Sequence, residues 1–331
     1  MKNSNEFINK SVFKVNLKYA RLQNKTKEIF FKCLNENKSL EDFRNELQKI
    51  WGNQDHNFLQ DELIEYEEMI HEQNLKGKVD KVKTESFMES LLNLVPVSVV
   101  IGVEERFKKI KEREYSNSLK SYAYKHSKEE YLKMKVPKYT NQVVPYYKKD
   151  TNQIQRYVQM STYNAMIHNT NLTRAGWNTT LNDADDLEIN EFWIPPHSFS
   201  CPYCAMYQGR VLSREEVELY IGTEAQEQEG DILHPNCKCT LTIYDGGMPL
   251  KRPQYTEAEI EEQYQIRQKV NSLTLKKEEI LTDIKIQKML GNQDEVDDLN
   301  SQRRKINSSI NELKEALPTA ELQRQVVAIN R

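Results

Sequence analysis

The chain has 331 residues, of which 38% are hydrophobic and 29% are charged, and its net charge is −3. This length suits two or three folded regions, and the charge excludes an overall positive field of the kind that holds nucleic acid. Gly and Pro number only 10 each, which favours helix over strand as the dominant element. The composition therefore predicts a mainly α fold.

The first 150 residues predict a helical body. Ser39, with Asp42 three positions later, predicts the capped start of a second helix, and further helices are expected over 55–71 and 103–134. Cys33 is expected to be a buried free thiol on an apolar face. The first helix is indicated by apolar residues at helical spacing, namely Val12, Val15, Tyr19, Leu22, Ile29, Phe30 and Leu34.

Positive charge gathers at the amino end of the chain. A basic first helix of this kind would suit an acidic partner such as DNA or a neighbouring subunit, but a solvated helix face is the favoured interpretation. Only two glutamates offset the eight cations, which are Lys2, Lys10, Lys14, Lys18, Arg21, Lys25, Lys27 and Lys32.

No membrane span or secretory signal is predicted at the amino end. The most apolar run, 91–103, is interrupted by Pro96 and is shorter than the roughly 20 residues that cross a bilayer. We expect a buried segment there, with membrane insertion as the alternative. Without an export signal, the five cysteines are expected in a reducing compartment, where closely spaced thiols favour metal binding over disulfides.

A polar helix is expected from residue 151 to about Gly176, after the break that Pro137 and Pro145 predict. His168 lies on this helix, and we expect it to be a surface or hydrogen-bonded residue rather than a catalytic base.

A small α+β module is predicted over 177–244, where turn residues become frequent. Ser213, with Glu216 three positions later, predicts the start of a short helix. A module this thin would need a staple to stay folded, and a metal ion would supply one. The β-prone pieces are EFWI (191–194), GRVLS (209–213) and CTLTIYD (239–245).

Four of the five cysteines fall within 39 residues and predict one zinc site. Cys201 and Cys204 form a Cys-x-x-Cys pair in a tight turn, and Cys237 and Cys239 would point to one face of a strand. Four such thiolates suit tetrahedral zinc. A set of Cys201, Cys204, His234 and Cys237 competes with the four-cysteine set, which we favour narrowly.

The predicted zinc is structural rather than catalytic. A catalytic zinc keeps an open position and a nearby base, whereas four thiolates leave no room for water, and the glutamates at 215, 216 and 218 fit a helix start. His197 is expected to lie further away, beside Pro195 and Pro196. No catalytic residue is predicted.

Residues 251–331 predict an antiparallel helical hairpin. Apolar residues alternate at three- and four-residue spacing from Ile266 to Ile284 and again from Val296 to Leu317, with Gly291 in the link. Such a narrow seam must pack on another helix. It would pack either on the helical body or on other subunits.

The cysteine-rich segments resemble the minor capsid (minor head) proteins of tailed phages that infect low-GC Gram-positive bacteria. These proteins are distantly related to the Mu F-like head morphogenesis proteins. The likeness covers about 163–245, and such proteins often have His where this chain has Cys239, as expected of a metal ligand. The residues that carry the resemblance are Cys201, Cys204, Gly209, His234, Pro235, Cys237 and Cys239.

The resemblance implies a structural virion protein, assembled in the host cytoplasm and held in a few copies inside the head near the portal. Its partners would be the portal or major capsid protein, and its role would be head assembly, DNA packaging or DNA delivery. The alternative is a toxin-like or nuclease enzyme that uses the cysteine module as a scaffold, although no catalytic constellation is recognisable. The expected domains are 1–150, 151–250 and 251–331.

Overall fold

The computed structural model describes residues 4–51, 57–75, 103–109, 111, 132, 142–147, 154–222, 237–247, 255–319 and 322–323. The predicted mainly α fold is confirmed. The helices are α1 (Ser4–Asn35), α2 (Leu40–Trp51), α3 (Asn57–Leu75), α8 (Met160–Asp186), α9 (Pro202–Ala205), α10 (Arg214–Gly222), α11 (Glu257–Met289) and α12 (Gln293–Glu315). The strands are β1 (Val143–Tyr147), β2 (Ile154–Gln159), β3 (Glu191–Trp193), β4 (Val211–Ser213) and β5 (Thr242–Ile243).

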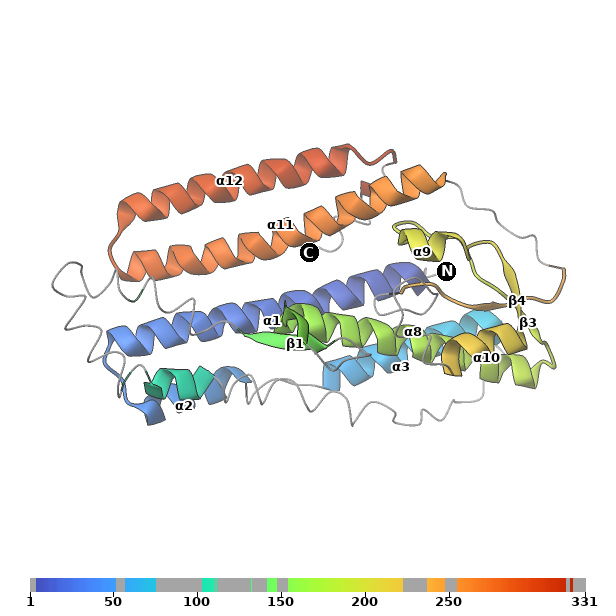
Figure 1. Cartoon of the computed structure of the whole chain (residues 1–331), viewed down its shortest axis with the longest axis horizontal. Helices are drawn as coiled ribbons and strands as arrows, with labels where there is room; N and C mark the ends of the chain where they lie inside the picture. Colours follow the sequence, from blue (N-terminus) through green and yellow to red (C-terminus); the bar gives the residue numbers. More distant parts are fainter. Residues whose placement is uncertain are drawn as a thin grey trace.

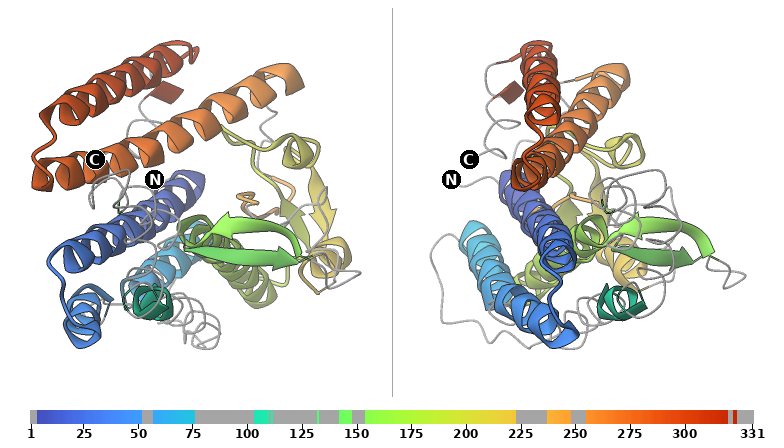
Figure 2. Two further views of the ribbon diagram at one scale, coloured as in Figure 1. Left: turned by 60° about the vertical axis from the view of Figure 1, so that its left-hand side comes forward. Right: turned by 90° about the vertical axis from the view of Figure 1, so that its left-hand side faces the viewer.

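Helix α1 lies at the centre of the molecule, between the α11/α12 hairpin on one side and α3 and α8 on the other (Figures 1 and 2). Its predicted apolar stripe is buried, apart from Val12, which is half-buried. Near its carboxyl end, Phe30 packs edge-on against Phe43 of α2 and against Phe107. Cys33 is buried in the same core, as expected.

Five cations of α1 form ion pairs within the molecule. Arg21 pairs with Glu278 at 3.1 Å, and Lys27 pairs with Asp283 at 2.6 Å, so both reach α11. Lys14, Lys10 and Lys25 pair with the glutamates at 62, 6 and 28, respectively. Each exposed pair adds at most about 1 kcal/mol, but the pairs to α11 help to fix the hairpin against α1.

Two predicted helix starts are confirmed by their capping contacts. The Asp42 amide donates to Ser39 Oγ at 3.0 Å, and the Ser39 amide donates to the Asp42 carboxylate at 3.0 Å. The same reciprocal pair joins Ser213 and Glu216 at the start of α10, at 3.3 and 2.8 Å. Each pair satisfies amides that the first helical turn leaves without partners.

The helix expected over 151–176 differs at both ends. Residues 154–159 form β2, because their β-prone Ile, Tyr and Val pair antiparallel with β1, in register from Val143 opposite Gln159. Helix α8 begins only at Met160 and then continues past Gly176 to Asp186. Gly176 is therefore an interior helical residue and not a terminator.

Gly176 allows α3 to approach α8 closely. A Cβ built at Gly176 would lie 2.7 Å from Cε1 of Tyr66, whose ring is buried and stacked on Phe7 with centroids 5.4 Å apart. Gly176→Ala should therefore destabilise the protein by about 1–3 kcal/mol, because the tyrosine ring must shift within a packed core. Thermal unfolding would measure this loss. A melting temperature equal to or above that of the wild type would contradict the close packing.

The module's three strands form an antiparallel sheet of order β4-β3-β5, which confirms the three predicted β pieces. Phe192 of β3 is fully buried and lies opposite Leu212 of β4 and Ile243 of β5. These residues pack with Trp177 of α8 into one core that also includes three of the cysteines. The module is thus built against α8.

The carboxyl-terminal hairpin is confirmed. Gly291 connects α11 to α12 with a φ of +69°, a left-handed conformation that glycine adopts without strain. Thr256 and Glu259 form a capping box at the start of α11. Because α11 packs along α1 (Figure 1), the hairpin lies on the helical body. Its apolar core includes Ile266, Val270, Ile280, Ile284, Val296, Leu299, Ile306, Ile310 and Leu317.

Some predictions fall outside the described residues. The apolar run over 91–103 lies outside the described residues except for Val103, which is buried at the start of a helical stretch over 103–109. Most of the helix expected over 103–134 also lies outside the described residues. Among the described helices, none combines the length and hydrophobicity that crossing a bilayer requires.

Candidate metal centre

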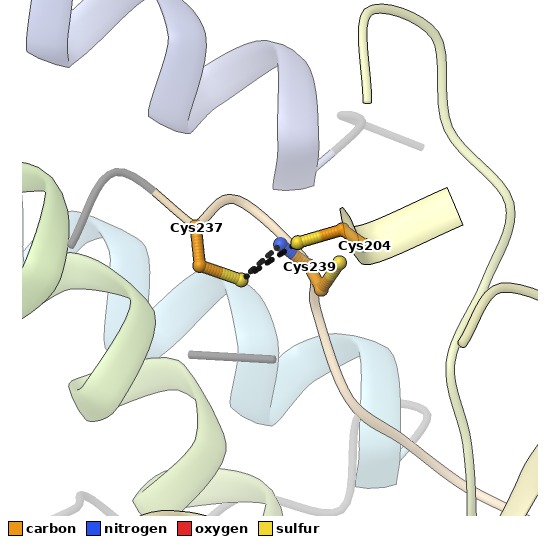
Figure 3. A group of neighbouring side chains, drawn as sticks. All are labelled: Cys204, Cys237 and Cys239. Carbon is orange, nitrogen blue, oxygen red and sulfur yellow. Dashed lines mark hydrogen bonds between the residues drawn. The ribbon is translucent and has the colours of Figure 1, made fainter. Parts of the chain in front are cut away.

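Three buried cysteines converge at the junction of the module and the helical body. The sulfur atoms of Cys204, Cys237 and Cys239 all lie within 4.8 Å of one another, and the first two are 3.6 Å apart. Figure 3 shows Cys204 approaching from α9, while the other two project from the extended segment before β5. The structure thus brings together three of the five predicted ligands.

The Cys-x-x-Cys pair is shaped by the short helix α9. Cys201 is its N-cap and Pro202 follows at the first helical position, where a missing N–H costs nothing. The Cys201 sulfur accepts the Cys204 amide at 3.3 Å. This turn directs the Cys204 side chain inward, where it is 1% exposed, while Cys201 remains partly exposed.

Side chains of α8 hold the second pair of cysteines. Asn169 Nδ2 and Thr173 Oγ1 both donate to the Cys237 carbonyl, at 2.6 and 2.9 Å. Trp177 Nε1 donates to the Cys239 carbonyl at 2.8 Å. Further along the helix, Thr180 Oγ1 lies 3.4 Å from the Leu241 carbonyl. The extended segment therefore bonds to a helix in place of a neighbouring strand.

The rise of helix α8 over four residues matches the rise of the extended segment over two residues. Four residues of an α-helix rise about 6.0 Å, and two residues of a strand rise about 6.6 Å. Polar side chains three or four positions apart on α8 can therefore meet every second carbonyl of residues 237–241. Carbonyls at alternate positions leave the Cys237 and Cys239 side chains on a common face, as their spacing predicted.

The sulfur separations fit a tetrahedral metal ion. With a Zn–S distance of about 2.3 Å, two thiolates on one zinc lie about 3.8 Å apart, close to the 3.6 Å between the sulfurs of Cys204 and Cys237. Hydrogen bonds from Cys201 and Cys237, together with burial, raise the pKa of the Cys204 thiol well above its ordinary value. Metal binding must therefore displace protons from these thiols.

The other candidate ligands lie outside the group of three cysteines or outside the described residues. Cys201 does not belong to the tight group of three, although its sulfur adjoins Cys204. His234 lies outside the described residues. His197, which we expected to lie further away, has its Nε2 atom 3.7 Å from the Cys239 sulfur. The turn from β3 through Pro195 and Pro196 carries the imidazole back to the cysteines, and sequence spacing gave no sign of this.

Positive charge from Arg267 and Lys238 lies beside the centre, since both cations act on His197. Arg267 of α11 is only 5% exposed, and its guanidinium carbon lies 5.6 Å from the centroid of the Phe199 ring. Burial lowers the pKa of Arg267 to about 10. Phe199, with a φ of +58°, is itself buried in the hairpin core. The loop between His197 and Cys201 is thus inserted into α11/α12.

A second polar cluster joins α1, α3 and α8. Ser11 Oγ donates to the Glu62 carboxylate and lies 2.6 Å from Nε2 of His168. These residue types also occur in serine hydrolases, but here Ser11 and His168 are 4% and 1% exposed, and the carboxylate lies beside the serine and Nε2. His168 Nδ1, which a hydrolase would orient by a carboxylate, has no hydrogen-bond partner. The cluster therefore suits helix packing, and His168 is hydrogen-bonded as expected.

This cluster predicts acid-sensitive stability. Burial by itself would raise the pKa of Glu62, but hydrogen bonds from its three neighbours outweigh burial and lower the pKa to about 2. The ionised carboxylate therefore stabilises the fold above about pH 4.5, and this contribution is lost as pH falls towards 2.

Glu62→Gln should lower the free energy of unfolding by up to about 3 kcal/mol at pH 7. The difference from wild type should disappear near pH 2. Chemical denaturation across this range, with Glu65→Gln as an exposed control on the same helix, would measure it. An equal effect of both substitutions would contradict the assignment.

Comparison with known proteins identifies the family. A family model described as phage minor capsid protein 2 matches residues 36–323, which include most of the helical body, the cysteine cluster and the hairpin. No curated protein and no solved structure matched the chain. The family match extends well beyond the segment over 163–245 on which the sequence resemblance rested. The chain therefore belongs to the phage minor capsid protein 2 family and is a structural protein of a phage virion.

Proposed function

We propose that this minor capsid protein acts near the portal, where it contacts the portal or major capsid protein and assists head assembly, DNA packaging or DNA delivery. The observation that carries the proposal is the family match over residues 36–323. The elongated helical body and the second helical layer in Figure 1 suit a structural protein that binds other virion proteins.

The same proposal includes a structural zinc ion held by the cysteine cluster. Cys204, Cys237 and Cys239 would supply three ligands, and the sequence patterns offered Cys201 and His234 as candidates for the fourth. The ion would join α9 to the segment before β5 and so close the module on α8. A site this buried, with sulfur donors, suits a structural role more than catalysis.

We do not propose catalysis. The one described cluster of hydrolase-like residue types, Ser11, Glu62 and His168, is closed off between three helices. Incubation of the purified protein with DNA and RNA, with Zn²⁺ or Mg²⁺, should give no cleavage. Cleavage that is abolished by substituting one acidic residue or histidine would support the nuclease alternative instead.

A DNA contact through α1 remains a weaker prediction. Arg21 and Lys27 bind carboxylates of α11, and Lys14 binds α3, so much of the helix's charge is already compensated. This charge compensation favours protein partners over DNA.

Cross-linking of purified virions, followed by mass spectrometry, would test the location. We expect cross-links from this protein to portal or major capsid subunits, and we expect phage lacking the gene to form heads with reduced DNA content or infectivity. Wild-type protein supplied in trans should restore both. Cross-links to distal tail proteins alone, or unchanged particles without the gene, would overturn the proposal.

A further inference from the structure

We infer that His197 is the fourth metal ligand, completing a Cys₃His centre with Cys204, Cys237 and Cys239, and that Cys201 stays outside the coordination sphere. This inference rests on the proposed metal centre and specifies its ligands. It replaces both ligand sets that the sequence suggested, because neither contains His197.

The imidazole of His197 is oriented as a metal-binding histidine requires. Its Nδ1 atom lies 3.0 Å from the carbonyl oxygen of Ser198, and since a carbonyl only accepts, Nδ1 carries the proton. In the neutral ring, Nε2 then presents its lone pair towards the sulfur of Cys239. A backbone carbonyl that fixes the tautomer in this way is the usual outer partner of a ligating histidine.

The separation of the two atoms also fits one shared ion. Zinc binds nitrogen at about 2.0–2.1 Å and sulfur at about 2.3 Å, so a tetrahedral centre places them about 3.6 Å apart. The observed distance between His197 Nε2 and Cys239 Sγ is 3.7 Å. Together with the 3.6 Å between Cys204 and Cys237, two edges of a tetrahedron have the expected length.

Cys201 is the weaker candidate for the fourth position. Neither Cys201 nor His197 belongs to the tight group of three sulfurs, so proximity to the whole group does not separate them. Cys201, however, is N-cap of α9, where its sulfur accepts the Cys204 amide, and it is more exposed than the three clustered cysteines. Its greater exposure therefore makes Cys201 the weaker candidate, whereas the Nε2 atom of His197 is directed at a buried sulfur.

The test uses the full chain purified with zinc, and three single variants: His197→Ala, Cys201→Ser and His234→Ala. X-ray absorption at the zinc edge of the wild type should show three sulfur neighbours and one nitrogen. His197→Ala should weaken zinc binding by at least about 10–100-fold in competition with a chelator. The other two variants should retain wild-type affinity.

A second substitution at position 197 distinguishes the loss of a metal ligand from a failure to fold. If His197→Ala fails to fold, His197→Cys should restore tight zinc with four sulfur neighbours, because it returns a donor to the same position. Four sulfurs in the wild type, or loss of affinity in Cys201→Ser or His234→Ala with His197→Ala unchanged, would overturn the inference while leaving the metal centre intact. Wild-type protein without tightly bound metal would instead refute the metal centre itself.

Discussion

Cys237→Ser is expected to remove the metal and unfold the module while leaving the helical body folded. Its sulfur lies 3.6 Å from that of Cys204, and its carbonyl accepts two hydrogen bonds from α8. Structural zinc contributes about 10–16 kcal/mol of apparent binding free energy in small zinc domains. Because apolar packing of Phe192 and Trp177 also supports this module, we expect a loss of at least about 3 kcal/mol.

Zinc content and hydrogen exchange would measure this effect. Amides of residues 189–222 and 237–247 should lose protection, whereas those of α1 should keep it. Cys33→Ser is the matched control, because Cys33 is equally buried but lies in the core shared by α1 and α2. Loss of zinc in the control, or full protection of the module in Cys237→Ser, would contradict the expectation.

Trp177→Phe is expected to destabilise the protein and also weaken metal binding. The substitution removes the donor to the Cys239 carbonyl and leaves that buried oxygen without a partner, at a cost of about 1–3 kcal/mol. Trp177→Ala also empties core volume and should cost about 3–5 kcal/mol. Both effects act on the segment that carries two of the proposed ligands.

Trp51→Phe provides the comparison for Trp177. Its indole also donates one hydrogen bond, to Thr26 Oγ1 at 3.0 Å, but it lies on α2 and is only partly buried. Denaturant titration and zinc affinity should therefore show a smaller stability loss and unchanged metal binding in this variant. Equal zinc affinities for the two variants would mean that α8 does not position Cys239.

The sequence predicted those parts of the fold that depend on local patterns. The caps at Ser39 and Ser213, the three β pieces and the hairpin around Gly291 all follow from spacing and turn chemistry within a few residues. The missed features depend on contacts between distant segments. Gly176 was expected to end a helix, but Tyr66, far away in the sequence, occupies the space beside it.

The candidate site shows the same division. The cysteine spacing predicted one site from Cys201, Cys204, Cys237 and Cys239, and the structure gathers the last three of these tightly. The approach of His197 depends instead on how the chain turns after β3. Hydrogen-bond donors recur on α8 at positions 169, 173, 177 and 180, and this spacing indicates a polar face. The sequence does not show what that face binds, because the acceptor carbonyls lie more than 60 residues later.

The bonding of an extended segment to a helix also fixes which side chains can reach the ion. In a strand paired with another strand, a slip by one residue still finds partners along the edge, but it reverses every side chain. Here the side chains of α8 donate only to alternate carbonyls, so the same slip would leave Trp177 without an acceptor and turn the Cys237 and Cys239 side chains away from Cys204. The helix therefore acts as a template that admits only the threading in which both cysteines face inward, before any ion is present.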